Sequence, residues 1–180
     1  GGLTFFIVVI QILSGMFLTM YYVPDIENAW NSVYFLQNEV AFGQIVRGMH
    51  HWGASVVIVM MFLHTMRVFF QGAYKKPREL NWIVGVLIFF IMLALGLTGY
   101  LLPWDMKALF ATKVTLTIID SVPFIGPYLM TLLAGDPTII GAQTLTRFFA
   151  IHVFFLPAAL IGLIAAHFLM IRKQGISGPL

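Results

Sequence analysis

The sequence predicts an all-α membrane protein, a transmembrane four-helix bundle with interfacial helices in the connection before its fourth span. Of its 180 residues, 60% are hydrophobic and 9% are charged, and the mean hydropathy is +0.93. An ordinary soluble domain carries about 25% charged residues. A helix needs about 20 apolar residues to cross roughly 30 Å of hydrocarbon. Four stretches without charged residues have about this length or more. These stretches are residues 1–24, 48–66, 80–104 and 148–171.

We expect one transmembrane domain over residues 1–180, with helices at about residues 1–23, 44–70, 80–103 and 146–172. A further apolar stretch, residues 121–135, is too short to cross the membrane and contains Pro123 and Pro127. It therefore predicts an interfacial helix and a turn. The same connection shows helix-like apolar periodicity at residues 109–119, and long structured connections often have a functional role.

Basic residues predict the orientation in the membrane. Lys75, Lys76 and Arg78 lie between the second and third spans, and Arg172 and Lys173 follow the fourth, whereas the first connection is largely acidic. Because Lys and Arg are in excess on the cytoplasmic side, both ends of the chain are expected in the cytoplasm. The net charge of +3 reflects this topology, so we expect no nucleic-acid partner.

The sequence contains no cysteine, which excludes disulfides and thiolate-bound metal or iron–sulfur centres within these residues. It also begins at Gly1 without a methionine or a recognisable signal peptide. We therefore expect that an N-terminal piece precedes it in the native protein.

The histidines of the second and fourth spans form two pairs. His50 and His64 are 14 residues apart, about 40° short of four helical turns, whereas His51 misses their face by about 140°. In the fourth span, His152 and His167 are 15 residues apart, about 60° beyond four turns. Because these two spans run in the same direction, the histidines fall at two levels separated by about 21 Å along the bundle.

Two facing imidazoles at each level suit a haem with one histidine on either side of its iron. The first and third spans carry glycine pairs with the same 14-residue step, Gly1 with Gly15 and Gly85 with Gly99. Glycine has no side chain to collide with a flat cofactor inside a bundle. The sequence therefore predicts two cofactor levels.

Other interpretations account for the individual residues. A histidine within a span often forms a hydrogen bond between helices, and glycine often marks a close helix contact. A single zinc or copper ion cannot occupy both levels, and the spans offer no carboxylate or thiolate ligand. His51 is interpreted as a structural residue.

Two other classes of protein also carry histidines within a membrane. A transporter without haem would use them as a proton relay, but it would also place charged residues inside its spans. The dihaem anchor of a hydrogenase or formate dehydrogenase has four helices, but it would lack the long connection before the fourth span.

Arg47 precedes His50 by three residues, and Arg67 follows His64 by three. A guanidinium at the membrane edge is suited to the propionates of a haem. Anchoring of the helix ends at the interface explains both arginines equally well.

Long sequence segments resemble a known family. The segments are RGMHHWGAS, LHTMR, KKPRELNW, GLTGYLLPWD, QTLTRFFAIH and HFLMIRKQGISGPL. Together they closely resemble the short, split cytochrome b of the cytochrome b6 class over essentially the whole chain, which implies a single cytochrome b N-terminal-type domain. AFGQIVRGMHHWGAS and LLPWDMKALFATK are most similar to the cytochrome b subunits of the menaquinol:cytochrome c reductases of Gram-positive bacteria.

The resemblance implies a role for each candidate residue. His50 and His152 would bind the outer haem b, and His64 and His167 the inner haem b. Haem contacts would come from Gly1, Gly15, Gly85, Gly99, Arg47 and Arg67. The quinone sites would include Tyr100, Trp104 and Lys113 on the outer side and Arg172 on the inner side. For these four, interfacial anchoring and the excess of inner positive charge are alternative explanations.

The resemblance also implies a subunit of a quinol:cytochrome c oxidoreductase in the bacterial cell membrane, inactive alone and coupled to proton translocation. The implied partners are a Rieske iron–sulfur subunit, a cytochrome c-type subunit, quinone, lipid and a second copy of the complex. The split partner subunit would supply the remaining helices and a Pro-Glu-Trp-Tyr motif, which does not occur here. Menaquinone or another quinone would be the substrate. In this class a cysteine two residues before the position of Gly1 tethers a c-type haem, and this chain begins too late to contain it.

Overall fold

The structure, a computed structural model, describes residues 1–136 and 139–176, and this part of the chain contains helices and no strands. Residues 177–180, which end the QGISGPL segment, lie outside the described residues. The helices are α1 (Gly2–Thr19), α2 (Ala29–Asn38), α3 (Gly43–Phe70), α4 (Glu79–Leu101), α5 (Met106–Asp120), α6 (Gly126–Ala134), α7 (Ala142–Ala150), the π-helical η1 (Ile151–Phe155) and α8 (Leu156–Gln174). The prediction of an all-α fold is confirmed.

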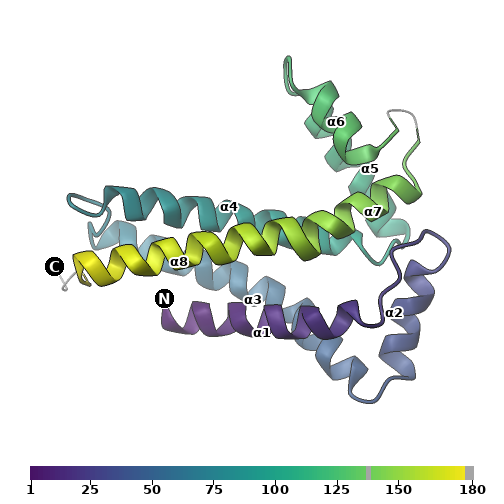
Figure 1. The fold of residues 1–180 in the computed structure, drawn as a ribbon, viewed down its shortest axis with the longest axis horizontal. Helices are drawn as coiled ribbons and strands as arrows, with labels where there is room; N and C mark the ends of the chain where they lie inside the picture. Colours follow the sequence, from purple (N-terminus) through teal and green to yellow (C-terminus); the bar gives the residue numbers. More distant parts are fainter. Residues whose placement is uncertain (137–138, 177–180) are drawn as a thin grey trace.

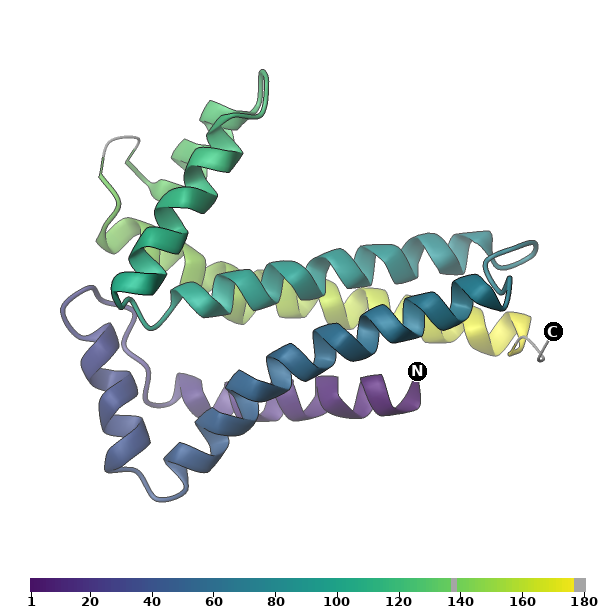
Figure 2. The same ribbon diagram turned by 180° about the vertical axis from the view of Figure 1, so that it is seen from behind.

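Four long helical segments run side by side as a bundle (Figures 1 and 2). They are α1, α3, α4 and the continuous run α7–η1–α8, and each is long and apolar enough to cross a membrane. Helix α1 packs on α3, α4 packs on α8, and α3 also contacts α4. The start of α1, the α3–α4 connection and the end of α8 lie toward one end of the bundle (Figure 1).

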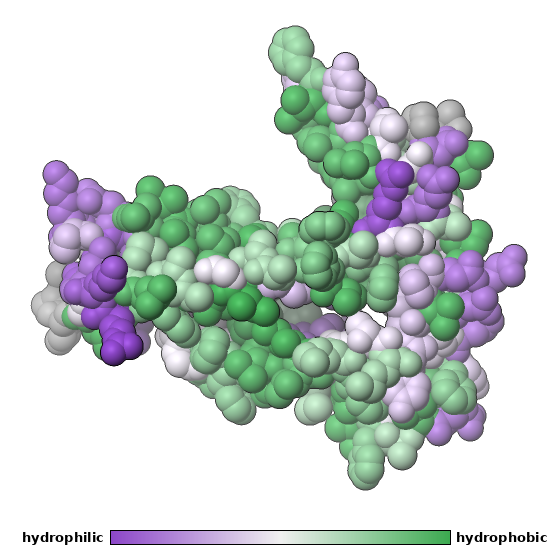
Figure 3. All heavy atoms as spheres, viewed as in Figure 1, coloured by the Kyte–Doolittle hydropathy of each residue, from purple (hydrophilic) through white to green (hydrophobic). Residues whose placement is uncertain are grey.

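The face of the bundle shown in Figure 3 is mostly apolar along its length, and hydrophilic residues gather toward its two ends. Large side chains such as Phe62, Phe90 and Phe154 remain more than half exposed. Water disfavours so much exposed apolar surface, whereas lipid chains accept it. The surface pattern agrees with the composition in indicating a membrane protein.

The packed core of the bundle lies between the two histidine levels. It consists of Val8, Val57, Met61, Ile88, Met92 and Leu160. Val57 is midway between His50 and His64, and Leu160 is midway between His152 and His167. The four helices therefore fill the bundle centre with aliphatic side chains and leave the histidines toward either end.

Two helical boundaries differ from the sequence prediction. Helix α1 ends at Thr19 instead of near residue 23. Pro24 has no N–H to donate to a preceding carbonyl, and it disfavours a helical backbone at the residue before it. The fourth span begins at Ala142, earlier than residue 146, and its hydrogen bonding widens to a π-helix just before Pro157.

Helix α2 lies in the first connection, where the sequence analysis predicted no helix. Its buried residues Ala29 and Leu36, with Val33 between them, have the spacing of one helix face. The helix packs against α3, and the Arg47 guanidinium donates to Gln37 Oε1. A ten-residue helix is too short to be found by a search for membrane spans.

Helices α5 and α6 pack on each other and project away from the bundle beyond the end of α4 (Figure 2). The Asp105 side chain caps α5 by accepting a hydrogen bond from the Ala108 N–H at 2.7 Å. A second buried cluster joins this projection to the bundle through Leu101, Leu116, Ala134 and Phe148. The predicted helices in this connection are therefore present.

Candidate cofactor site

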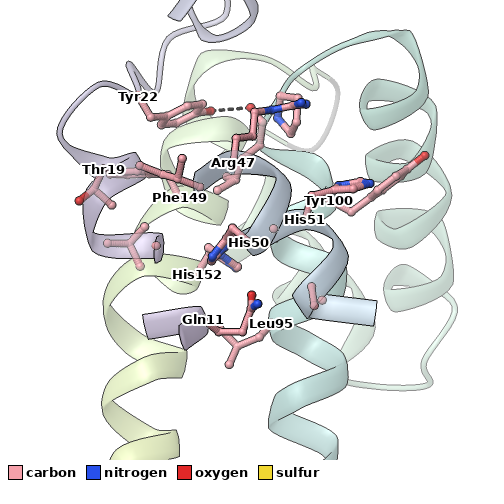
Figure 4. Close-up of a pocket in the computed structure, with 18 of the residues that line it drawn as sticks. Gln11, Thr19, Tyr22, Arg47, His50, His51, Leu95, Tyr100, Phe149 and His152 are labelled. Atoms are coloured by element: carbon pink, nitrogen blue, oxygen red, sulfur yellow. Dashed lines mark hydrogen bonds between the residues drawn. The ribbon is translucent and has the colours of Figure 1, made fainter. Parts of the chain in front are cut away.

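His50 of α3 and His152 of η1 face each other inside the bundle (Figure 4). Their ring centroids are 6.3 Å apart and their planes are nearly perpendicular, at 85°. A metal–imidazole bond is about 2.0 Å long. Two imidazoles bound to one ion on opposite sides therefore have their ligating nitrogens about 4 Å apart, and their ring centroids lie farther apart than these nitrogens. The observed spacing fits a single iron between the two rings.

Hydroxyl groups from two other helices contact these imidazoles. Ser14 Oγ of α1 lies 3.0 Å from His50 Nδ1, and Thr98 Oγ1 of α4 lies 3.0 Å from His152 Nδ1. Both hydroxyl residues are buried. Each histidine of this level is therefore oriented by a hydrogen bond to a neighbouring helix.

Each glycine of the two predicted pairs faces one histidine. A Cβ atom at the glycine would lie 3.1 Å from Cε1 of the histidine for Gly15 and His50, 2.6 Å for Gly99 and His152, 3.4 Å for Gly85 and His167, and 3.7 Å for Gly1 and His64. At Gly99 a Cβ would require the imidazole to shift, and at Gly15 a Cβ would be a tight contact that the imidazole could relieve only by moving a few tenths of an ångström.

A cavity of about 790 Å³ surrounds the pair of His50 and His152. This volume lies in the range of cofactor and ligand pockets, about 300–1,000 Å³. Its floor includes Val57 and Leu160 of the central core. Tyr22 lines the opposite end, where its hydroxyl donates to the Leu102 carbonyl at 2.5 Å (Figure 4).

The second level contains His64 of α3 and His167 of α8. Nδ1 of His167 is buried and has no hydrogen-bond partner among the described residues. Arg67 is exposed at the end of α3, one turn beyond His64.

Not all the residues suggested for the quinone sites reach the cavity. Tyr100 and Arg47 line it, whereas Trp104 and Lys113 are not among its lining residues in the described part of the chain. Lys113 is exposed on α5, and Trp104 occupies the turn after α4 with a positive φ of 53°. Arg172 is exposed at the end of α8, on the side of the second level.

Several residues of the site were not among the candidates from sequence. They include Ser14, Thr98, Tyr22 and Lys107, all in or beside the cavity. For the two hydroxyl residues a signal was available, because Ser14 and Thr98 each directly precede the glycine that faces His50 or His152, in Ser-Gly and Thr-Gly. No comparable sequence pattern marks Tyr22 or Lys107.

His51 lies at the side of the cavity and points away from the facing pair (Figure 4). It is exposed and packs edge-on against Trp52, with ring centroids 5.3 Å apart. This position agrees with the helical geometry that separated His51 from the face of His50 and His64.

Paired imidazoles therefore provide the donor set of this site, and no group of three or more His, Cys, Asp or Glu side chains gathers elsewhere in the described residues. The fold and the site define a transmembrane helical bundle with histidines paired across it, which is the arrangement that bis-histidine haem proteins use. The family model described as Cytochrome b/b6/petB matches residues 1–175. The chain belongs to this cytochrome b family.

Individual relatives agree with this assignment. The chain is 84% identical, over its full length and 80% of theirs, to the menaquinol:cytochrome c reductase cytochrome b subunits of Geobacillus thermodenitrificans and Bacillus subtilis (strain 168). It is 46% identical over its full length to cytochrome b6 of Trichodesmium erythraeum (strain IMS101), covering 81% of that protein. A solved chain of a hyperthermophilic respiratory Complex III superposes with a TM-score of 0.91 at 35% identity. That alignment covers 99% of this chain and 48% of the solved one.

Proposed function

We propose that this protein is the cytochrome b subunit of a menaquinol:cytochrome c reductase, which carries electrons from an outer quinol-oxidation site to an inner quinone-reduction site. The observation that carries the proposal is the 6.3 Å approach of His50 and His152, each beside a glycine of the facing helix. The second histidine level, about 21 Å along the helices, repeats the donors and glycines. The names of the bacterial relatives supply the reaction.

The residues present fit two haems b. A haem held at each level supplies a site that accepts and releases one electron. His50 and His152 would hold the outer iron, and His64 and His167 would hold the inner one. The glycines keep the helix backbones close to the cofactor faces, and the core between the levels excludes water.

The polar ends of the bundle give the reaction its direction. Arg47 lines the outer cavity, where its guanidinium would neutralise a propionate of a bound haem, and Arg67 would do the same at the inner level. Tyr100 lies near the entering quinol at the cavity side, and Arg172 lies near the quinone at the opposite end. Oxidation outside and reduction inside release protons outside and take them up in the cytoplasm.

The subunit acts only within a complex. A Rieske iron–sulfur subunit accepts the other electron of the quinol, and a cytochrome c-type subunit follows it. The split partner subunit supplies the remaining helices, and the complex forms a dimer in the bacterial cytoplasmic membrane. Both ends of this chain face the cytoplasm, beside the basic residues Lys75, Lys76, Arg172 and Lys173.

A reduced-minus-oxidised absorption spectrum of the purified complex tests the proposal, with pyridine haemochrome quantification of haem per chain. We expect two noncovalent b haems on this polypeptide. A c-type signal on the same polypeptide would locate a covalent haem on a preceding cysteine. A complex without b haem would overturn the electron-transfer function and leave the histidines as a polar relay.

A further inference from the structure

The two histidine levels differ in the groups that contact Nδ1 of their imidazoles. At the outer level Ser14 contacts His50 and Thr98 contacts His152, both at 3.0 Å from Nδ1. Both hydroxyl residues directly precede the glycine that faces the same histidine. In each Ser-Gly or Thr-Gly pair, the first residue thus contacts the imidazole through its hydroxyl, and the glycine lets the same imidazole lie close to the helix backbone.

The hydroxyl protons are already used within their own helices. Ser14 Oγ donates to the Ile10 carbonyl at 2.7 Å, and Thr98 Oγ1 donates to the Ala94 carbonyl at 2.7 Å. A hydroxyl has one proton and two acceptor lone pairs. Each hydroxyl can therefore accept from the histidine, alongside the backbone of Gln11 for His50 and of Leu95 for His152. An acceptor at this side places the imidazole proton on Nδ1 and leaves the Nε2 lone pair free to bind iron.

The inner level lacks this arrangement on α4. Val84 occupies the position before Gly85, where the outer level has Thr98 before Gly99. Correspondingly, His167 Nδ1 is buried and forms no hydrogen bond with a hydroxyl group, and only the backbone of Asn81 on α4 interacts with this imidazole among the described residues. Valine and threonine have nearly the same shape, so the difference between these positions is mainly the hydroxyl group.

We infer that Ser14 and Thr98 are positioning residues that lower the reduction potential of the outer haem relative to the inner haem. This inference rests on the proposed function. A hydrogen bond from the far nitrogen of a ligating imidazole fixes its tautomer and makes it a stronger electron donor. A stronger donor stabilises the ferric over the ferrous state, which lowers the potential. The side chains therefore favour electron transfer from the outer level to the inner one.

Redox titration of the purified complex, followed at the b-haem absorption bands, tests the inference. The variants Ser14→Ala and Thr98→Val remove one hydroxyl each. Each is expected to change the ferric-to-ferrous equilibrium of the same haem by about tenfold, which raises its potential by about 59 mV for a one-electron couple. The conservative variants Ser14→Thr and Thr98→Ser retain a hydroxyl and should keep potentials close to those of the wild type.

The inner level allows the opposite change. Val84→Thr adds a hydroxyl beside His167. It is expected to lower the reduction potential of the inner haem by a similar amount and to leave the potential of the outer haem unchanged. This variant keeps the volume of the side chain, so it tests the inference even if Ser14→Ala fails to assemble. Thr117→Val serves as the matched control, because Thr117 is exposed on α5 and its hydroxyl bonds only the Lys113 carbonyl.

The outcomes separate this inference from the proposed function. Two b haems whose potentials are unchanged in Thr98→Val and Val84→Thr would overturn the role of the hydroxyls but not electron transfer. Lower thermal stability with unchanged potentials would show that the hydroxyls act only in packing. A wild-type complex without b haem would overturn the proposed function itself.

Discussion

A methyl group at Gly99 would lie 2.6 Å from Cε1 of His152, closer than non-bonded carbon atoms approach. Gly99→Ala is therefore expected to displace the His152 imidazole and to lower the haem content of the outer level. Overpacking of this kind costs about 1–3 kcal/mol of stability. The ratio of b haem to protein and the thermal unfolding of the purified complex measure the two effects.

The other glycines provide a graded series. A Cβ would lie 3.1 Å from the facing imidazole at Gly15 and 3.4 Å at Gly85, so alanine should be less harmful at Gly85 than at Gly99. Gly162→Ala on α8 is the control, because no side chain of the described residues lies within 4 Å of the position that an alanine Cβ would take there. It should gain up to about 1 kcal/mol from helix propensity. Greater haem loss in Gly85→Ala than in Gly99→Ala would contradict this interpretation.

Replacing one histidine should empty one level and leave the other occupied. His167→Ala removes a proposed inner ligand, whereas the outer pair of His50 and His152 is about 21 Å away along the helices. We expect the b-haem content per chain to fall by about half and one set of absorption bands to remain. His51→Ala is the control and should retain both haems, because His51 is exposed and packs against Trp52. Retention of both haems in His167→Ala would contradict the proposal that His64 and His167 together hold one haem.

The fold and the histidine geometry could be predicted because both depend on simple periodicities. A run of about 20 apolar residues needs a helix in lipid, and steps of 14 and 15 residues return to nearly the same helix face. These rules predicted that His50 and His152 meet across the bundle, and the rings do face each other. Their ligation of haem stays a prediction.

The remaining features depend on contacts between segments distant in sequence. The hydrogen bond of Thr98 to His152 spans 54 positions, and no local pattern specifies it. Helix α2 is short and stabilised by packing on α3, so hydropathy alone did not find it. The π-helical turn around His152 depends on the backbone hydrogen bond that Pro157 cannot donate.

Arg47 either neutralises a propionate or only joins α3 to α2 through Gln37, and two variants distinguish these roles. Arg47→Gln removes the positive charge and should stabilise the ferric state of the outer haem. The expected fall in its potential is on the order of 59 mV, which corresponds to tenfold in a one-electron equilibrium. Gln37→Leu breaks the contact with α2 but keeps the charge, so it should leave the potential unchanged. Equal shifts in both variants would indicate a purely structural role.

Tyr22 fixes the end of α1 to the turn after α4. Its hydroxyl donates to the Leu102 carbonyl at 2.5 Å, and its ring stacks on Phe149 at a centroid distance of 5.4 Å. Tyr22→Phe keeps the stacking but leaves the carbonyl without this donor, which typically costs about 1–3 kcal/mol when the group is buried. Thermal unfolding of the purified complex should therefore occur at a lower temperature in the variant.

The pH dependence of the difference in unfolding temperature between the wild type and Tyr22→Phe tests whether the Tyr22 hydroxyl causes that difference. Burial raises the pKa of Tyr22 above its ordinary value, because the folded protein disfavours the charged phenolate. The contribution to stability is then fully present below the pKa of the unfolded chain, about 10. It is lost as the pH rises above that value and through the pKa of the folded state. Unfolding temperatures measured between neutral pH and pH values above about 10 should converge for the wild type and Tyr22→Phe. A constant difference across this range would mean that the variant acts through packing and not through the phenol proton.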